Sequence, residues 1–135
     1  MNIENLKASQ KTDQLFLVLA DHYDTSHATF YYYKKEEEWQ LVLETPALIG
    51  QRGMGEGKEG ARQTPVGEYT FGKLMGIAPD PGTKMDYHQI TEDDYWCGEQ
   101  YYNEFVDEKT MDHSHCTKEN DEHLIEYTKP YEYTA

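Results

Sequence analysis

The distribution of apolar and polar residues in the first third of the chain predicts three short strands. Residues 14–20 form a continuous apolar run that is too short for a typical helix and suits a buried strand. Residues 28–33, rich in aromatic side chains, and residues 39–44, with apolar side chains on one face, predict two further strands. Polar turns separate the three, so we expect an antiparallel meander. Residues 1–13 are polar and are expected to form a flexible tail.

The remainder of the chain is broken up by proline and by turn-forming residues. Pro46 is expected to interrupt the chain after the third strand, because proline cannot donate to a ladder. Thr91 and the acids that follow it resemble a helix N-cap and first turn, and residues 121–127 fit one short helix with an acidic start. We expect a mainly β fold with one or two short helices. Further strands are predicted over residues 66–74, 87–90 and 131–133.

Length and charge narrow the classes of function. A chain of 135 residues is expected to form one domain with a core of its own. The 26 acidic residues outnumber the 12 basic ones and give a net charge of −14, so a nucleic-acid partner is disfavoured by repulsion. The apolar run at 15–20 is too short for a transmembrane segment and lacks the flanks of a signal peptide. The sequence fits a cytoplasmic protein or an exported one without its leader.

Residues 49–69 are dense in glycine, which indicates sharp turns or a close approach of the backbone to another group. Three basic side chains, Arg52, Lys58 and Arg62, gather in this stretch of an otherwise acidic chain. They could hold an anionic ligand or a carboxylate. They could equally be the solvated charges of a long hairpin loop. The glycines are Gly50, Gly53, Gly55, Gly57, Gly60 and Gly67.

Two further clusters lie in the second half of the chain. Aromatic residues between positions 95 and 105 suit core and edge packing, or a ring platform for a sugar. Residues 112–116 combine histidine with Cys116, but the spacing lacks the second pair of ligands typical of structural zinc, so we expect no metal and no cofactor. The two cysteines, Cys97 and Cys116, could form one disulfide or remain as free thiols.

A series of short motifs follows in a fixed order and resembles the N-terminal portion of the L,D-transpeptidase catalytic-domain family, often called YkuD-like. The likeness covers about residues 14–133, so we expect residues 14–135 to be the N-terminal part of such a domain. Ala61 departs from the family pattern, which has aspartate there. The motifs are Gly50-Gln51-Arg52-Gly53, Lys58-Glu59-Gly60, Thr64-Pro65-Val66-Gly67, Phe71-Gly72, Tyr95-Trp96, Tyr102-Asn103, Glu122-His123-Leu124 and Tyr131.

This resemblance implies a β-sandwich and acyl transfer on peptidoglycan stem peptides. Family members attack a peptide carbonyl with a cysteine thiolate, aided by a histidine base and backbone donors to the oxyanion. Their catalytic cysteine lies in a Gly-Cys signature, expected downstream of all the motifs named above. Cys116 lacks the preceding glycine, and Cys97 lies in the Tyr-Trp segment, where the family normally has no catalytic group, so neither is assigned as nucleophile. We therefore expect a sandwich that is incomplete at its C-terminus and has no catalytic activity alone.

The resemblance also implies partners, compartment and site residues. Peptidoglycan or its peptides would be the partner, and the location would be extracytoplasmic or in the cell envelope. Open edges of an incomplete sheet would allow self-association. The motif scaffold would comprise Gly53, Glu59, Gly60, Thr64, Pro65 and Gly67. The substrate cleft would draw on Arg52, Lys58, Arg62, Tyr95, Trp96, Tyr102 and Asn103.

Two other classes of function stay open on the sequence alone. A non-catalytic β module could hold a glycan or a protein on its tyrosine-rich surface and would be insensitive to thiol alkylation. A small zinc domain would lose its fold with a chelator. Its ligands would be His113, His115, Cys116 and His123.

Overall fold

The structure is a computed structural model that describes residues 2–58, 60–97, 104–107, 122–128 and 133–134. The fold is mainly β, which confirms the fold class predicted from the sequence. One domain is expected from the length, whereas the structure divides into two compact units. Unit 1 is Met1–Glu68 and unit 2 is Tyr69–Ala135. No helix among the described residues is long and apolar enough to cross a membrane.

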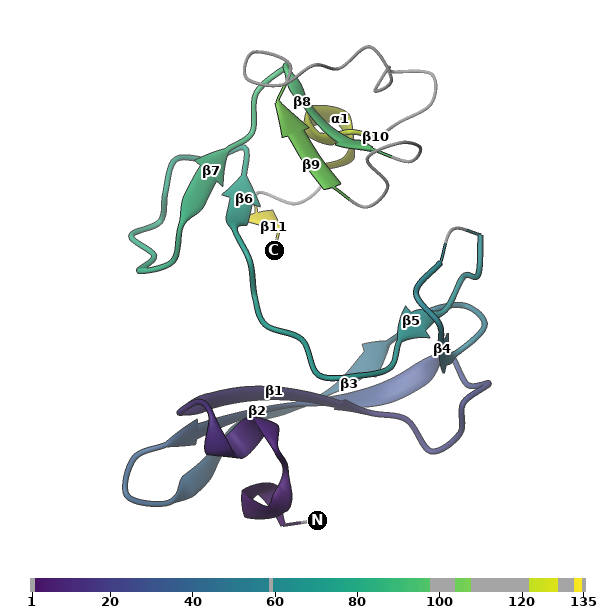
Figure 1. The fold of residues 1–135 in the computed structure, drawn as a ribbon, viewed down its shortest axis with the longest axis vertical. Coiled ribbons are helices and arrows are strands. Elements are labelled where there is room, and N and C mark those ends of the chain that lie inside the picture. Colours follow the sequence, from purple (N-terminus) through teal and green to yellow (C-terminus); the bar gives the residue numbers. More distant parts are fainter. Residues whose placement is uncertain (1, 59, 98–103, 108–121, 129–132, 135) are drawn as a thin grey trace. The chain divides into compact units, whose positions relative to one another are not determined.

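Unit 1 is built on a three-stranded antiparallel sheet in the order β1-β2-β3 (Figure 1). The predicted meander is therefore confirmed. Phe16 lies directly opposite Tyr32, and its ring packs edge-on against that tyrosine and at a tilt against Phe30 on the same face. These aromatic cross-strand pairs fix the register of the hairpin. The strands are β1 (Gln14–Leu19), β2 (His27–Lys35) and β3 (Trp39–Leu48).

The third strand is longer than the sequence predicts. It continues through Pro46, which pairs with Thr29, so the expected interruption at this proline is wrong. The physical reason is position: β3 is an edge strand among the described residues, and an edge tolerates a residue that cannot donate on its open side. The ladder between β2 and β3 also shifts register between Tyr32 and Tyr33, which marks a bulge.

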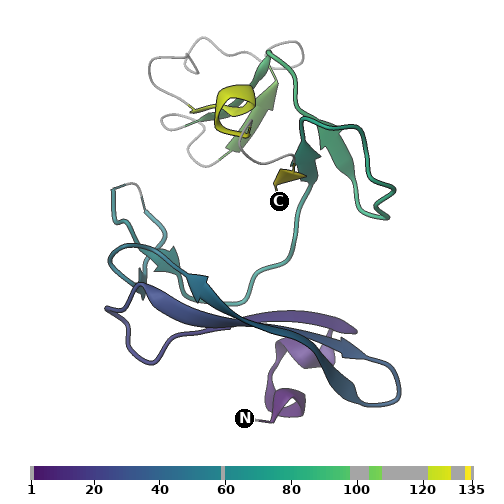
Figure 2. The same ribbon diagram turned by 180° about the vertical axis from the view of Figure 1, so that it is seen from behind.

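The first residues of unit 1, expected as a flexible tail, form two 3-10 helices, η1 (Ile3–Asn5) and η2 (Ala8–Gln10). The side chain of Asn2 caps η1 by accepting the N–H of Glu4 at 3.0 Å. Ile3 is buried, so this segment has an apolar anchor. Figures 1 and 2 show both helices beside one face of the β1-β2 hairpin.

The glycine-dense stretch ends unit 1 and holds two short parallel strands, β4 (Met54–Gly55) and β5 (Thr64–Pro65). The strand predicted over residues 66–74 is not present. The backbone instead runs without regular structure from Val66 to Lys73. Gly67 has a φ of 152°, which lies outside the strand region and stops the extension of β5.

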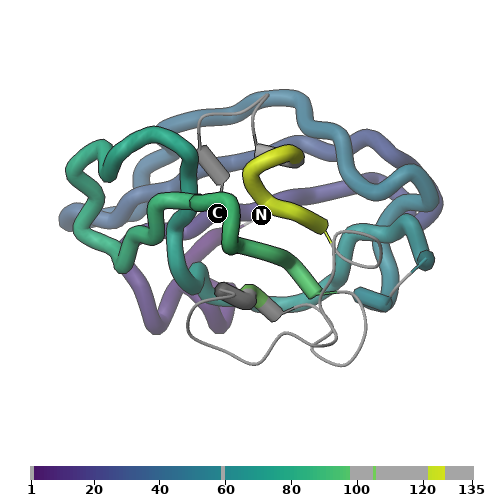
Figure 3. Tube along the Cα trace, turned by 90° about the horizontal axis from the view of Figure 1, so that it is seen from above, coloured from purple at the N-terminus to yellow at the C-terminus, as the bar shows by residue number. Residues whose placement is uncertain are grey.

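Unit 2 contains two small sheets. The first has the order β11-β6-β7, with β6 and β7 parallel, and the second has the order β10-β8-β9 and is antiparallel. The short helix α1 (Leu124–Thr128) follows β10 and is the yellow turn in Figure 3. The strands are β6 (Leu74–Gly76), β7 (Tyr87–Gln89), β8 (Asp94–Cys97), β9 (Glu104–Asp107), β10 (Glu122–His123) and β11 (Tyr133–Thr134).

Among the described residues of unit 2, Met75, Ile90 and Leu124 form a buried apolar cluster, so β6, the residue after β7, and α1 all contribute to it. Trp96 and Phe105 pack against this cluster from β8 and β9. The helix is confirmed close to residues 121–127, where the sequence predicts one. The second predicted helix is not formed, because Thr91 opens a tight turn that leads directly into β8.

Candidate functional site

The glycine stretch is held against the connection between β1 and β2. Gly53 is buried with a φ of +79°, and a Cβ atom there would overlap the carbonyl oxygen of Tyr23. The N–H of Met54 donates to that same oxygen at 2.8 Å. Only glycine combines this backbone conformation with such a close approach. This glycine therefore fixes where the loop starts.

Backbone hydrogen bonds join the two ends of the loop. The N–H of Arg52 donates to the carbonyl oxygen of Arg62 at 2.9 Å, and the N–H of Thr64 donates to that of Gly53 at 2.9 Å. The hydroxyl of Thr64 accepts the N–H of Gly50 at 2.8 Å. The side-chain amide of Gln63 donates to the carbonyl oxygen of Met54 at 3.3 Å. The segments at 50–54 and 62–65 therefore lie side by side as a closed base.

A backbone hydrogen bond closes the tip of the loop. The N–H of Ala61 donates to the carbonyl oxygen of Lys58 at 3.1 Å, and Gly60 has a φ of +73°. Arg62 follows with a φ of +54°, an uncommon backbone conformation for a residue with a side chain. The turn thus forms with alanine at position 61, and the strain falls on Arg62.

The three basic side chains differ in their surroundings. Lys58 places its Nζ 3.3 Å from Oε2 of Glu56, so its charge is partly compensated. Arg62 donates from Nη1 to Oε1 of the neutral Gln51 at 3.3 Å. Among the described residues, neither Arg62 nor Arg52 has a carboxylate within 4.0 Å. Two exposed guanidinium groups without an ionic partner therefore stand on the base of the loop.

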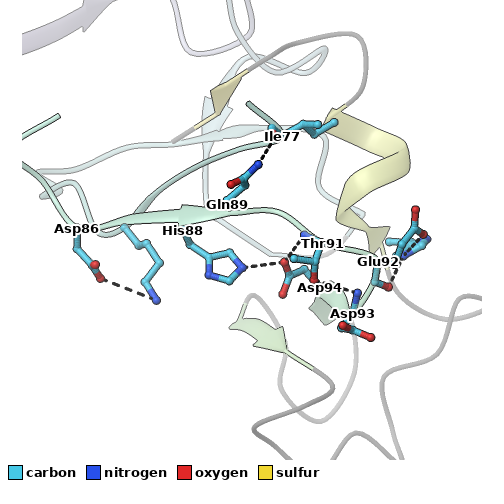
Figure 4. Close-up of polar contacts among 10 residues, drawn as sticks. Ile77, Asp86, His88, Gln89, Thr91, Glu92, Asp93 and Asp94 are labelled. Atoms are coloured by element: carbon cyan, nitrogen blue, oxygen red, sulfur yellow. Dashed lines mark hydrogen bonds and ion pairs between the residues drawn. The ribbon is translucent and has the colours of Figure 1, made fainter. Parts of the chain in front are cut away.

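A second polar cluster lies in unit 2, around the turn between β7 and β8 (Figure 4). Asp94 is fully buried, and its Oδ2 accepts the N–H of Thr91 at 2.7 Å and Nε2–H of His88 at 2.7 Å. The ring of His88 packs edge-on against Phe105, with 4.9 Å between centroids. Oδ1 of Asp94 has no hydrogen-bond partner in the described part of the chain. The buried carboxylate of Asp94 therefore stabilises the turn by accepting these two hydrogen bonds.

His123 joins the same turn to α1. It is buried, and its Nε2–H donates to the carbonyl oxygen of Glu92 at 2.8 Å. Its Nδ1 lies 3.3 Å from Oε1 of Glu126 on the helix. The ring of Tyr95 stacks on it at a centroid distance of 4.8 Å. The histidine is thus a structural link, and Tyr95 contributes to packing inside unit 2.

The residues predicted for the substrate cleft fall into three groups. Arg52, Lys58 and Arg62 lie on the loop of unit 1, and the first and last of them are adjacent across its base. Tyr95 and Trp96 lie on β8 of unit 2, where Trp96 packs against the buried apolar cluster. The scaffold residues Gly53, Gly60, Thr64, Pro65 and Gly67 are all described within the loop. Tyr102, Asn103 and Glu59 lie outside the described residues.

Cys97 is buried on β8 and disulfide-bonded. The only other cysteine of the sequence, Cys116, lies outside the described residues, as do His113 and His115. No group of three or more potential metal ligands occurs among the residues that the structure describes. A surface hollow in unit 1 is lined by none of the predicted site residues. Its lining comprises Asn2, Ile3, Glu4, Glu38 and Trp39.

The sequence interpretation did not single out His88 or Asp94. The signal available was Thr91 followed by Asp94, a spacing that permits a side chain to close a turn. The same residues also fit a helix start, because the two patterns share a cap residue and acids. Comparisons with protein-family models, with characterised proteins and with solved structures find no significant match to this chain.

Proposed function

We propose that this chain forms part of a YkuD-like L,D-transpeptidase domain, one that contacts peptidoglycan stem peptides without supplying the nucleophile. The main support is the backbone of the glycine motifs. Gly53, Gly60 and Gly67 have φ values of +79°, +73° and +152°, conformations that favour glycine. The motif residues of the loop therefore occupy positions where their identity matters for the backbone, as expected of a scaffold for a binding site.

The environment of Cys97 supports a non-catalytic role for this chain. A nucleophilic cysteine must reach its substrate as a thiolate. Cys97 has a relative exposure of 1% and is disulfide-bonded, so it offers neither access nor a thiolate. Cys116 follows His115 in the sequence rather than the glycine of the family signature. Acyl transfer in such a domain would therefore depend on a cysteine outside these 135 residues.

The disulfide also supports an exported location. Disulfides persist in oxidising compartments and are rare in reducing ones. A unit of 67 residues gains stability from such a cross-link, because a short chain buries little apolar surface. An extracytoplasmic location in the cell envelope is the compartment in which this chain would meet peptidoglycan.

The proposal is tested by titrating the 15N-labelled chain with a synthetic stem tetrapeptide. We expect saturable shifts of amide signals from residues 50–67 and no covalent adduct in the intact mass. A tetrapeptide of the same composition in scrambled order is the control and should shift these signals much less. A covalent peptide adduct, or binding that leaves residues 50–67 unchanged, would contradict the proposal.

A second candidate function is a non-catalytic module that binds a glycan or a protein. The favouring observation is the outer strand of the unit 1 sheet, where three consecutive apolar side chains are about half exposed. Soluble proteins seldom leave such a run uncovered without a function. These residues are Leu41, Val42 and Leu43. This alternative predicts that partner binding is lost in Leu43→Lys and retained in Arg52→Gln.

A further inference from the structure

We infer that Arg52 and Arg62 together bind a carboxylate group at the base of the glycine loop. That the carboxylate belongs to a peptide rests on the function proposed above, whereas the two-arginine site rests on the geometry of the loop. Neither arginine has a carboxylate partner among the described residues. Both side chains are exposed to solvent. A ligand could therefore reach both guanidinium groups.

The backbone brings the two arginines together. The 2.9 Å hydrogen bond from the N–H of Arg52 to the carbonyl oxygen of Arg62 makes these residues direct neighbours across the loop. Their side chains start from adjacent positions although nine residues lie between them in sequence. Nη1 of Arg62 is oriented by Gln51, the residue that precedes Arg52. One planar carboxylate can accept hydrogen bonds from such a pair.

The base of the loop is rigid enough to keep this arrangement. Gly50, Gly53 and Thr64 are tied by hydrogen bonds of 2.8 to 2.9 Å, and Gln63 spans the two segments with its side chain. The left-handed backbone of Arg62 persists only because these contacts define it. A site organised before binding loses less entropy when the ligand arrives.

The charge of the whole protein selects among anions. The net charge of −14 repels anions in general, and a doubly charged phosphate more strongly than a singly charged carboxylate. Two guanidinium groups with no carboxylate partner among the described residues provide a local exception to that repulsion. The planar guanidinium group can hydrogen-bond to either a phosphate or a carboxylate. The smaller negative charge of the carboxylate therefore favours its binding to this acidic protein.

Lys58 provides a matched control on the same loop. It is also exposed and cationic, but Glu56 lies 3.3 Å from its ammonium group. If binding required only positive charge near the loop, Lys58→Gln would weaken it as much as Arg52→Gln. A specific two-arginine site requires the arginine variants alone to lose affinity.

The test uses N-acetyl-alanyl-alanine with a free carboxylate, its C-terminal amide, and inorganic phosphate, each titrated into the 15N-labelled chain. We expect the carboxylate peptide to shift amide signals of residues 50–54 and 62–64, and the amide and phosphate to bind at least tenfold more weakly. Arg52→Gln and Arg62→Gln should each weaken binding about tenfold. Lys58→Gln should change it less than twofold. Equal binding of the amide, or of phosphate, overturns the inference.

Two further variants separate loss of charge from loss of fold. Arg62→Asn removes the guanidinium while keeping a residue that tolerates a left-handed backbone. Its amide spectrum should match the parent outside residues 50–64, and its affinity should fall as in Arg62→Gln. Arg62→Lys retains the charge without the fork and should recover only part of the affinity. Full affinity in Arg62→Asn overturns the inference. A stem tetrapeptide that still shifts residues 50–67 in that variant would leave the proposed function standing.

Discussion

Asp94 and His88 form a 2.7 Å hydrogen bond, with the carboxylate fully buried and the histidine on the neighbouring strand β7. The same carboxylate oxygen accepts the N–H of Thr91 at 2.7 Å. One side chain thus satisfies two donors at the turn that connects the two sheets of unit 2. A buried acceptor of this kind stabilises a fold mainly because its loss leaves donors without partners.

The first prediction concerns this carboxylate. Asp94→Ala should lower the free energy of unfolding of unit 2 by about 3 kcal/mol, since the N–H of Thr91 and the ring of His88 lose their buried acceptor. Trp96 fluorescence in a Trp39→Phe background reports on unit 2 during denaturation. Asp86→Ala is the control: this aspartate is largely exposed and lies 3.8 Å from Lys73, so its loss should cost less than about 0.5 kcal/mol. Equal losses in the two variants would show that Asp94 does not organise the turn.

A second prediction compares two glycines of the loop. Gly53 and Gly60 have similar positive φ values, but a Cβ at Gly53 overlaps Tyr23 while one at Gly60 has no atom within 4 Å. Gly60→Ala should therefore cost about 1 kcal/mol, for backbone strain alone. Gly53→Ala should cost at least about 3 kcal/mol, because the backbone of residue 23 must move as well. Urea denaturation followed by Trp39 fluorescence in a Trp96→Phe background measures both. Similar costs would mean that the loop is not held against Tyr23.

A third prediction concerns the disulfide of Cys97. Cys97→Ala should lower the free energy of unfolding of unit 2 by about 3 kcal/mol, because the unfolded chain is then no longer constrained. Unit 1 carries no cysteine and should unfold unchanged. The two tryptophan reporters described above distinguish the units. A reducing agent should reproduce the effect in the parent protein and add nothing in Cys97→Ala; a stable, reductant-insensitive unit 2 would refute this account.

A fourth prediction concerns self-association through the unit 1 sheet, for which the open side of β3 is the expected surface. Sedimentation velocity over a concentration series should show reversible oligomers of the parent chain. Leu43→Lys should shift the protein toward monomer, because a charge on an edge strand opposes pairing. Met85→Lys, on an exposed apolar residue of unit 2, should leave the distribution unchanged. A monomer at every concentration would contradict this prediction.

The parts of the fold that were predicted from sequence are those determined by local pattern. Residues 14–20 and 28–33 gave β1 and β2 because apolar and aromatic runs of that length suit only strands. The interruption predicted at Pro46 is wrong, because a strand accepts proline when it lies at the edge of a sheet. That position is a property of the assembled sheet. Residues 66–74 resembled a strand by composition, but the φ of Gly67 prevents it.

The sequence likewise predicts only part of the candidate site, because the rest depends on tertiary contacts. Composition alone directed attention to Arg52, Lys58 and Arg62. It could not show that Lys58 faces Glu56 while the two arginines adjoin each other, since that depends on how the loop closes. The bond between His88 and Asp94 joins two strands across a turn and leaves no periodic signature.

We propose that this chain binds peptidoglycan without performing acyl transfer on its own, and co-sedimentation with purified sacculi tests this proposal. We predict saturable pelleting with sacculi and none with cellulose, unaffected by prior thiol alkylation. Recovered protein should have the unmodified intact mass. Failure to pellet with sacculi at any concentration, or recovery of the chain with a covalently attached stem peptide, would contradict the account.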